Sequence, residues 1–196
     1  MPESVLVEAV GDPVLFRAMR EAGLLTAVRD AKLVCPLRLN LVNEDFVFSD
    51  DLALGREAVM GAGATTAALI QAAWPSRPVG RMLDLGCGAG TVALFLARMA
   101  EHAWGVDINA RALTMAGLNA RLADVRQIRF LQSDLFSALP GESFDLIVAQ
   151  PPFVACPEDD TAITFLHGGA RGDELTLRLL GDLPDRLAPG GRAVLL

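Results

Sequence analysis

Three glycines stand close together in the segment LDLGCGAG, residues 83–90, directly after an apolar run. Because glycine has no Cβ, Gly86, Gly88 and Gly90 allow the backbone to take positive φ angles and to approach a ligand closely. A loop that binds a dinucleotide follows the pattern G-x-G-x-x-G, but here the fifth position is the glycine and the sixth is Thr91. The spacing predicts a ligand-binding turn and disfavours a nicotinamide dinucleotide as its ligand.

Two acidic residues accompany this turn. Asp84 precedes the first glycine, and Asp107 closes the next predicted strand. A carboxylate at the end of that second strand can accept hydrogen bonds from both hydroxyls of a ribose. An acidic residue before the glycine turn repels a pyrophosphate and suits the ammonium group of an amino acid. The pair predicts a ligand that carries a ribose and a positive group and has no phosphate.

A rigid polar tetrapeptide, Gln150-Pro151-Pro152-Phe153, follows the apolar run at residues 144–149. The two prolines fix φ, so the side chain of Gln150 and the carbonyl of residue 150 or 151 point at one spot. Phe153 adds a flat face for stacking. Such a site can accept hydrogen bonds from the N–H groups of a planar amine or amide, a positioning mechanism that needs no strong general base. The alternative is a Pro-Pro turn that only ends the strand.

The elements that position these residues alternate between strand and helix after Pro78. Strands are expected at 81–85, 103–107, 128–131, 144–149 and 192–196, and helices at 91–100, 110–122 and 174–187. This rhythm predicts an α/β fold, a doubly wound and mostly parallel sheet with helices on both faces. Ligands bind beyond the carboxyl ends of such strands, where the glycine turn and the tetrapeptide both fall.

The first 50 residues have a different pattern. Helical spacing of apolar residues predicts a helix over 12–31, and alternation predicts a hairpin over 37–48 with its turn at Asn43. We interpret residues 1–50 as an accessory segment and residues 51–196 as the ligand-binding domain. The uncharged stretch at 58–76 consists mostly of small residues and contains polar ones, so it predicts a buried helix rather than a membrane span.

In this order and spacing, LDLGCGAG, GVDIN, SDLF and QPPF resemble the class I S-adenosylmethionine-dependent methyltransferases, over roughly residues 55–196. The resemblance implies a Rossmann-like fold with S-adenosyl-L-methionine as cofactor. It implies that the turn holds the methionine part, that Asp107 takes the ribose hydroxyls and Ile108 the adenine ring, and that Asp134 with Leu135 meets the adenine amino edge. For Asp134 a helix N-cap is the alternative. The residues that the resemblance assigns to the cofactor are Asp84, Gly86, Cys87, Gly88, Gly90, Asp107, Ile108, Asp134, Leu135 and Gln150.

The tetrapeptide is similar to the Asn-Pro-Pro-Tyr/Phe motif of methyltransferases that act on base amino groups or on a glutamine amide of release factors. In this small-domain group, the resemblance implies that Gln150, Pro151, Pro152 and Phe153 are catalytic, with Gln150 in place of the usual asparagine. The segment with His167-Gly168-Gly169 loosely matches the Gly-Gly-x-Asp-Gly-Leu segment of release-factor glutamine methyltransferases. We expect it to border the substrate cleft, with Glu174 beginning the next helix.

The leading interpretation is an enzyme that transfers a methyl group to an amide or amino nitrogen. With 24 acidic and 17 basic residues, the net charge of −7 opposes a large phosphate contact, so a protein side chain or small molecule is the preferred acceptor. An rRNA or tRNA base methyltransferase, a cofactor-binding module without turnover and a nicotinamide oxidoreductase remain alternatives, and the oligomeric state stays open.

The cysteines and the two ends of the chain complete the sequence-based expectations. Cys35, Cys87 and Cys156 have neither CxxC nor Cys/His spacing, which predicts no disulfide framework, no metal site and a cytoplasmic setting without a membrane partner. The last residues, 193–196, are apolar, whereas family members usually place two further strands after this one. We expect a truncated or incomplete copy of the fold, unless a dimer partner covers the open edge.

Overall fold

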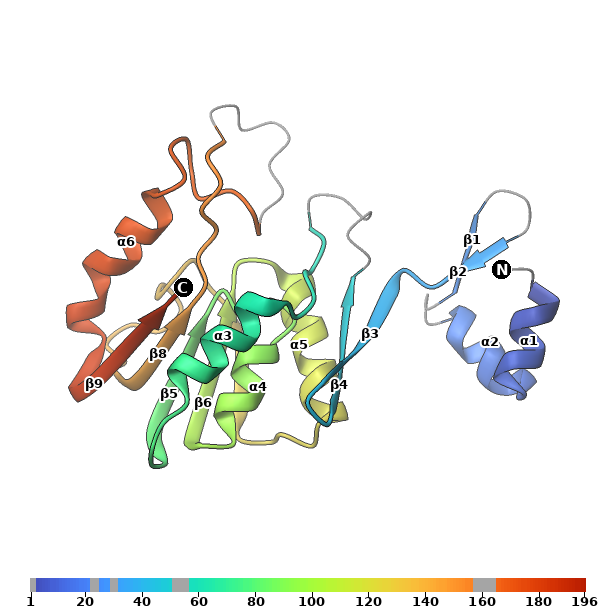
Figure 1. Ribbon diagram of the computed structural model, residues 1–196, viewed down its shortest axis with the longest axis horizontal. Helices are drawn as coiled ribbons and strands as arrows, with labels where there is room; N and C mark the ends of the chain where they lie inside the picture. Colours follow the sequence, from blue (N-terminus) through green and yellow to red (C-terminus); the bar gives the residue numbers. More distant parts are fainter. Residues whose placement is uncertain (1–2, 22–24, 29–31, 51–56, 157–164) are drawn as a thin grey trace. The chain divides into compact units, whose positions relative to one another are not determined.

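The computed structural model describes residues 3–21, 25–28, 32–50, 57–156 and 165–196 (Figure 1). The chain forms two compact units, Met1–Arg38 and Leu39–Leu196. The division into an accessory segment over 1–50 and a methyltransferase domain over 51–196 stays a prediction.

The first unit contains two short helices, α1 (Glu3–Val10) and α2 (Pro13–Glu21), and two antiparallel strands, β1 (Thr26–Val28) and β2 (Lys32–Val34). The Asp12 carboxylate accepts a hydrogen bond from the Val14 N–H at 2.8 Å, which helps α2 to begin. The helix expected over 12–31 is wrong in its second half, because α2 ends at Glu21 and β1 follows. Phe16, Leu25 and Leu33 form a small core that favours a strand there.

The predicted hairpin is confirmed by strands β3 (Leu37–Val42) and β4 (Asp45–Asp50), which pair in a two-stranded sheet. Asn43 in the connecting turn has a φ of +51°, a conformation that asparagine tolerates better than most residues. β4 packs on helix α5 (Ala110–Leu122), within the larger unit.

The larger unit is built on a parallel sheet, which confirms the predicted fold class. Its strands are β5 (Val79–Leu85), β6 (Ala100–Asp107), β7 (Ile128–Gln132), β8 (Phe144–Ala149) and β9 (Leu187–Leu195), in the order β7-β6-β5-β8-β9. The chain runs outward from β5 to β7 and then crosses back to β8 beside β5. In open sheets of this kind, ligands bind beyond the carboxyl ends of the strands at such a reversal, which here lies between β5 and β8.

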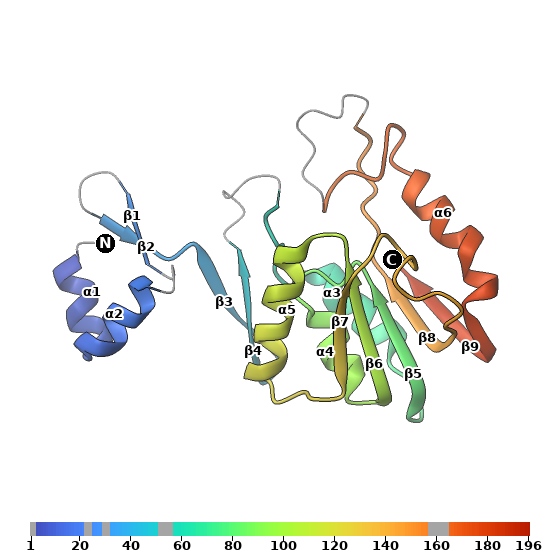
Figure 2. The ribbon, with the colours of Figure 1, turned by 180° about the vertical axis from the view of Figure 1, so that it is seen from behind.

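Side chains that alternate along the strands build a core on each face of the sheet. Met82 and Leu146 pack with Leu69 of α3 (Ala64–Ala73) and Leu94 of α4 (Thr91–Ala97) on one face. Seen from behind, the strands lie in front of α3 and α4 (Figure 2). Leu83 and Ile147 point the other way.

The second face is covered mainly from the C-terminal part of the unit. Leu179 of α6 (Glu174–Asp182) and Leu183 of the short 3-10 helix η4 (Leu183–Asp185) are buried there beside Phe136 and Leu139. The turn after β7 therefore contributes to this layer together with α6. The two layers of helices hold the sheet rigidly beneath its carboxyl edge.

Several expected boundaries are wrong. α4 ends at Ala97, and η4 replaces the last part of the helix expected over 174–187. β9 begins at Leu187 rather than at residue 192, because Leu187 already pairs with Phe144 of β8. The next pair is Arg192 with Leu146, so β9 contains a bulge between Leu187 and Arg192.

The uncharged stretch at 58–76 is helical only from Ala64. Before the helix, the Val59 carbonyl accepts from the Asp50 N–H at 3.0 Å, and the Val59 N–H donates to the Asp50 carboxylate at 2.9 Å, so the chain is bound to the end of β4. A Cβ at Gly61 would lie 2.6 Å from the Ser49 hydroxyl, which shows how closely the segment approaches β4. Among the described residues, no helix has the length and hydrophobicity that crossing a membrane requires.

Candidate active site

The glycine turn directly follows β5 and is held by the neighbouring strand. The N–H groups of Gly86 and Cys87 both donate to the Val106 carbonyl of β6, at 2.8 and 3.0 Å. As expected, Gly86, Gly88 and Gly90 have positive φ angles of +71°, +52° and +81°. Such angles are strained for residues with a Cβ, so the backbone course of this turn depends on glycine.

The three glycines differ in what surrounds them. A Cβ at Gly86 or Gly88 would meet no atom within 4 Å, so this side of the turn faces open space. A Cβ at Gly90 would lie 2.8 Å from the Cβ of Ala116, so this glycine also lets α5 pack against the turn. The first two glycines therefore leave room for a ligand, and the third serves packing.

Asp107 joins the end of β6 to the glycine turn. Its Oδ2 accepts from the Gly88 N–H at 2.8 Å, and its Oδ1 accepts from the Asn109 N–H at 2.9 Å. The side chain is half-buried at the carboxyl edge of the sheet. Each carboxylate oxygen has a further lone pair, so both can still accept a hydroxyl of a ligand.

Asp84 lies at the end of β5 and is only 3% exposed. Burial raises the pKa of its carboxyl to about 7, against a hydrogen bond from the Ala93 backbone and with a further contribution from the charge of Asp107. Among the described residues, Asp84 Oδ2 has no hydrogen-bond partner. An unpartnered carboxylate oxygen and a second acid beside the turn fit a cationic ligand and oppose a phosphate.

Cys87 lies inside the turn, with its side chain 7% exposed. Burial, with the charges of Asp84 and Asp107, raises the pKa of its thiol well above the usual range. The thiol is therefore neutral and packs in the turn, and a reactive thiolate is not favoured here.

An apolar side chain lies open beyond β6. Ile108 is 55% exposed directly after Asp107, and its carbonyl accepts from the side-chain amide of Gln132 at 2.9 Å. This bond fixes the backbone on which Ile108 stands. An exposed isoleucine beside a carboxylate suits the flat face of a nucleoside base.

The turn after β7 is organised by serine side chains. The buried Ser133 hydroxyl donates to the Leu135 carbonyl at 2.7 Å and accepts from the Ala138 N–H at 3.0 Å. Leu135 takes a φ of +48°, which is unusual for a leucine. The Asp134 side chain instead forms an ion pair with Arg178 of α6 at 3.0 Å, with both side chains about half exposed. The structure therefore gives Asp134 a partner other than the backbone N–H groups of its own turn.

Gln150 and the two prolines leave the sheet beside the glycine turn, because Leu85 of β5 pairs with Ala149 of β8. The Gln150 side chain is half-buried, and its Nε2 donates to the hydroxyl of Thr65 in α3 at 2.9 Å. Phe153 is 72% exposed. The tetrapeptide thus combines an amide fixed by α3 with an aromatic ring open to a ligand.

The segment around His167 packs directly on this tetrapeptide. The Val154 N–H donates to the Leu166 carbonyl at 2.8 Å, and the Gly168 N–H donates to the Val154 carbonyl at 3.1 Å. A Cβ at Gly168 would lie only 2.3 Å from the carbonyl oxygen of Pro152, so a glycine is required there. The segment therefore lies against the tetrapeptide, and its place at the border of a substrate cleft stays a prediction.

Glu174 fixes the other end of that segment. Its carboxylate accepts from the N–H groups of Arg171 and Gly172, at 2.9 and 3.1 Å, and these bonds lower its pKa. A Cβ at Gly172 would lie 2.4 Å from the Phe153 carbonyl. The start of α6 is thereby tied to the tetrapeptide backbone.

One important residue was missed by the sequence analysis. Asn119 of α5 is completely buried; its Oδ1 accepts from the Phe48 N–H at 2.8 Å, and its Nδ2 donates to the carbonyls of Phe48 and Ala89 at 2.9 and 2.8 Å. It therefore ties β4 to the glycine turn. The available signal was a polar amide among the apolar positions of the helix at 110–122.

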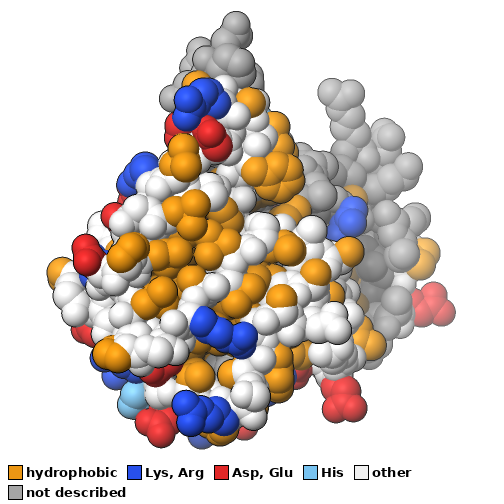
Figure 3. All heavy atoms as spheres, turned by 60° about the vertical axis from the view of Figure 1, so that its left-hand side comes forward, with side chains coloured by type: hydrophobic (Ala, Val, Ile, Leu, Met, Phe, Trp, Pro, Cys, Tyr) orange, Lys and Arg blue, Asp and Glu red, His pale blue; other side chains and the backbone are white. Residues whose placement is uncertain are grey.

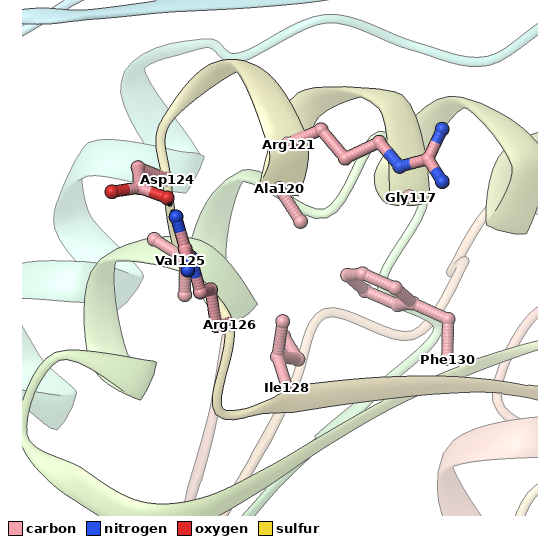
Figure 4. A pocket seen from close by; sticks show the side chains of 8 residues that line it. All are labelled: Gly117, Ala120, Arg121, Asp124, Val125, Arg126, Ile128 and Phe130. Atoms are coloured by element: carbon pink, nitrogen blue, oxygen red, sulfur yellow. Dashed lines mark hydrogen bonds and ion pairs between the residues drawn. The ribbon is translucent and has the colours of Figure 1, made fainter.

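A hollow of about 500 Å³ lies elsewhere, between the C-terminal part of α5 and the start of β7. Figure 4 shows Phe130, Ile128 and Arg121 around it, with Arg126 beside Asp124. The predicted site residues do not line it, and it begins at the amino end of β7, whereas the glycine turn follows the carboxyl end of β5. The arrangement of the strands places the candidate site at the glycine turn instead.

The comparisons with known proteins show the family to which this chain belongs. Residues 61–194 match the family model described as methyltransferase small domain. Over 126 residues the chain is 36% identical to the ribosomal protein uL3 glutamine methyltransferase of Xanthomonas campestris pv. campestris, covering 59% of this chain and 41% of that protein. It is 34% identical over 134 residues to the release factor glutamine methyltransferase of Rhodopirellula baltica, covering 61% and 45%.

A third relative has a name of another kind. The ribosomal RNA small subunit methyltransferase C of Alcanivorax borkumensis is 34% identical over 112 residues, covering 57% of this chain and 30% of that protein. The chain thus spans less than half the length of each of these three relatives.

Two solved structures share the fold. A SAM-dependent methyltransferase from Agrobacterium tumefaciens has a TM-score of 0.57 at 20% identity, covering 91% of this chain and 61% of that one. An N-methyltransferase from Bradyrhizobium japonicum, in complex with S-adenosyl-L-homocysteine, has a TM-score of 0.51 at 23% identity, covering 67% and 59%. With a family model matched over residues 61–194, on this sheet and around this glycine turn, the chain belongs to the methyltransferase small domain family.

Proposed function

We propose that this protein is an S-adenosyl-L-methionine-dependent methyltransferase that transfers a methyl group to an amide or amino nitrogen. The observation that carries the proposal is the pairing of Leu85 with Ala149. It brings a glycine turn flanked by two carboxylates beside a rigid tetrapeptide with an amide and an exposed aromatic ring. The same edge of the sheet can then hold a cationic nucleoside and a planar nitrogen compound.

The residues that would hold the cofactor are those of the turn and the two strand ends next to it. Gly86 and Gly88 leave open space, Asp107 offers both carboxylate oxygens to the ribose hydroxyls, and Ile108 offers an apolar face to the adenine. Asp107 supplies negative charge for a cation, and the carboxyl of Asp84 lies buried behind the turn with one oxygen unpartnered among the described residues. Cys87 packs inside the turn, and Asp134 and Leu135 follow on the adenine side. When bound, the cofactor supplies an electrophilic methyl group on a positively charged sulfur.

The tetrapeptide would position the acceptor. The side-chain oxygen of Gln150 and a backbone carbonyl of the tetrapeptide can accept hydrogen bonds from the two N–H groups of a planar amide or amine. The ring of Phe153 can stack on that planar group. With both N–H groups engaged, the nitrogen is held in one orientation beside the cofactor pocket. The chain's contribution is orientation, which alone can account for a large rate enhancement.

A protein side-chain amide is the acceptor that we favour. Relatives of this chain are named for methylation of glutamine in a ribosomal protein and in release factors. The net charge of −7 also opposes an extended contact with a phosphate backbone. A small molecule with an amide or amino group would use the same contacts.

A base amino group in rRNA is the second candidate. A relative named as a ribosomal RNA methyltransferase favours it, and the 72% exposed ring of Phe153 can stack on a base as well as on an amide. The two candidates use the same atoms of the tetrapeptide and differ in what surrounds the acceptor.

The test is transfer from radiolabelled cofactor to separated protein, RNA and metabolite fractions by the unmodified protein and by Gln150→Ala. We expect label in the protein fraction, a loss of at least about 100-fold in transfer for the variant, and unchanged cofactor affinity. Gln71→Ala, at an exposed glutamine of α3, is the matched control and should transfer normally. Equal transfer by Gln150→Ala would remove the tetrapeptide from the mechanism, and label only in RNA would favour the second candidate.

A further inference from the structure

Helix α3 reaches the acceptor side of the site through one hydroxyl group. We propose that Thr65 is a positioning residue that orients the amide of Gln150 so that its carbonyl oxygen faces the acceptor nitrogen. The inference rests on the function proposed above for the tetrapeptide. Its basis is the hydrogen bond from Gln150 Nε2 to Thr65 Oγ1, 2.9 Å long, between residues that are far apart in the sequence.

The first turn of α3 is held in place, so the backbone that carries the Thr65 hydroxyl has a defined position. The Thr66 hydroxyl accepts from the Gly63 N–H at 3.1 Å and caps the helix. Leu69 and Ala73 on the same helix are buried in the core against the sheet. At the other end, the Arg192 guanidinium of β9 donates to the Ala73 carbonyl at 2.7 Å. α3 thus carries Thr65 at a set distance from the carboxyl end of β8.

The direction of the bond decides what Gln150 can offer. A glutamine amide has one oxygen that accepts and one nitrogen that donates two hydrogens. Because the nitrogen is engaged by Thr65, the oxygen remains available; no hydrogen bond to it occurs among the residues that the structure describes. This oxygen can only accept hydrogen bonds, so it favours a methyl-accepting substrate whose nitrogen carries a hydrogen.

The hydrogen bond between Gln150 and Thr65 also restricts the conformations of the Gln150 side chain. Compared with the asparagine usual in similar motifs, Gln150 has one more methylene and one more rotatable bond, which would let the amide turn away from the site. A hydroxyl at hydrogen-bond distance on a neighbouring helix limits that freedom. Gln150 and Thr65 therefore act as a pair, because the orientation of the Gln150 amide depends on the Thr65 hydroxyl.

A double-mutant cycle on the full chain tests the pair. Thr65→Val keeps the shape of the side chain without its hydroxyl. We expect it to lower kcat about tenfold with cofactor affinity, measured by calorimetry, changed less than about twofold. Thr65→Ser should restore kcat. In a Gln150→Ala background, Thr65→Val should have no further effect on the residual rate.

The matched control is Thr114→Val, which removes a hydroxyl of α5 that donates to the Ala110 carbonyl of its own helix at 3.0 Å. This variant should leave kcat unchanged. A second readout needs no substrate: the side-chain amide signals of Gln150 in a ¹H–¹⁵N spectrum, assigned by their loss in Gln150→Ala. They should shift in Thr65→Val and keep their positions in Thr114→Val.

The possible outcomes separate this proposal from the function on which it rests. Full turnover in Thr65→Val with unshifted amide signals, while Gln150→Ala is inactive, overturns the role of Thr65 alone. Full turnover in both Thr65→Val and Gln150→Ala overturns the function proposed for the tetrapeptide. A Thr65→Val variant that loses cofactor affinity as strongly as turnover also contradicts the proposal, because the helix would then act on the cofactor.

Discussion

Two carboxylates lie next to the glycine turn, and their surroundings differ. Asp107 accepts hydrogen bonds from two backbone N–H groups at the carboxyl edge of the sheet, whereas Asp84 is buried, and one of its oxygens has no partner in the part of the chain that the structure describes. Burial favours the neutral form of Asp84, and the hydrogen bonds of Asp107 hold its carboxylate in place. The same residue type thus serves as a buried acid behind the turn and as a half-buried hydrogen-bond acceptor beside it.

The first prediction concerns stability against pH. The pKa of Asp84 is about 7 in the native protein and near 3.8 when the chain is unfolded. The contribution of Asp84 to the free energy of unfolding is therefore most favourable below pH 3.8 and is lost as pH rises through 7. The reason is that the unfolded state releases a proton that the native state still retains. Between these limits the loss is up to about 4 kcal/mol. Asp84→Asn should remove the loss.

Urea denaturation at pH 4.5 and pH 8.5 measures this effect. The free energy of unfolding of Asp84→Asn relative to the unmodified protein should be larger at pH 8.5 than at pH 4.5. Asp185→Asn, at an exposed position of η4, should show no such difference. An equal effect of Asp84→Asn at both pH values contradicts a raised pKa.

Among the elements, α5 does more than cover the sheet. Its buried Asn119 bonds to β4 and to the glycine turn, and its Arg111 forms a two-contact ion pair with the buried Asp50 at the end of β4. Burial alone would raise the pKa of Asp50, but the hydrogen bonds from Arg111 and from the Val59 N–H lower it. The hairpin of β3 and β4 is thereby linked through α5 to the candidate cofactor site.

The second prediction concerns α5: Asn119→Ala should lower the free energy of unfolding by about 2–4 kcal/mol. The substitution leaves the Phe48 N–H and the Phe48 and Ala89 carbonyls without their partner, and such losses in a core are costly. Arg121→Ala, at an exposed position of the same helix, should change stability by less than about 0.5 kcal/mol. Equal unfolding midpoints for the two variants in urea would show that the Asn119 amide contributes little.

The sequence predicts the sheet well because the sheet follows from local patterns, and the site residues stay a prediction at its carboxyl edge. Strand-helix alternation after Pro78 and the position of Gln150 behind an apolar run are visible without a structure. The ends of elements are not, since Leu25 and Leu33 favour a strand only through their contacts with Phe16. Thr65 was missed because its partner is 85 positions away in the sequence.

At the scale of the whole molecule, an apolar area lies on the side that carries α6 and β9. Figure 3 brings forward the side with α6 and β9, and hydrophobic side chains gather there in a continuous area. Leu177, Leu180 and Leu196 are each about half exposed, and in the described sheet β9 pairs only with β8. Such an area is typical of surfaces that associate with other chains. The candidate site itself lies within the unit Leu39–Leu196.

A fragment of residues 39–196 should therefore bind the cofactor like the full chain. All residues assigned to the cofactor belong to this unit, and the core on both faces of its sheet is formed within it. We expect dissociation constants within about twofold in calorimetry, alongside circular dichroism that verifies folding of the fragment. A well-folded fragment with at least tenfold weaker binding would indicate that the first unit contributes to the cofactor site.

The central claim is that the glycine turn and its two acids bind a cationic nucleoside without a phosphate. Calorimetry with S-adenosylmethionine, S-adenosylhomocysteine and NAD tests it most directly. We expect binding of the first two, no measurable binding of NAD, and a loss of about 1.5–3 kcal/mol in binding free energy for both nucleosides in Asp107→Ala, with Asp185→Ala unchanged. Tight binding of NAD, with no binding of S-adenosylmethionine, would contradict it.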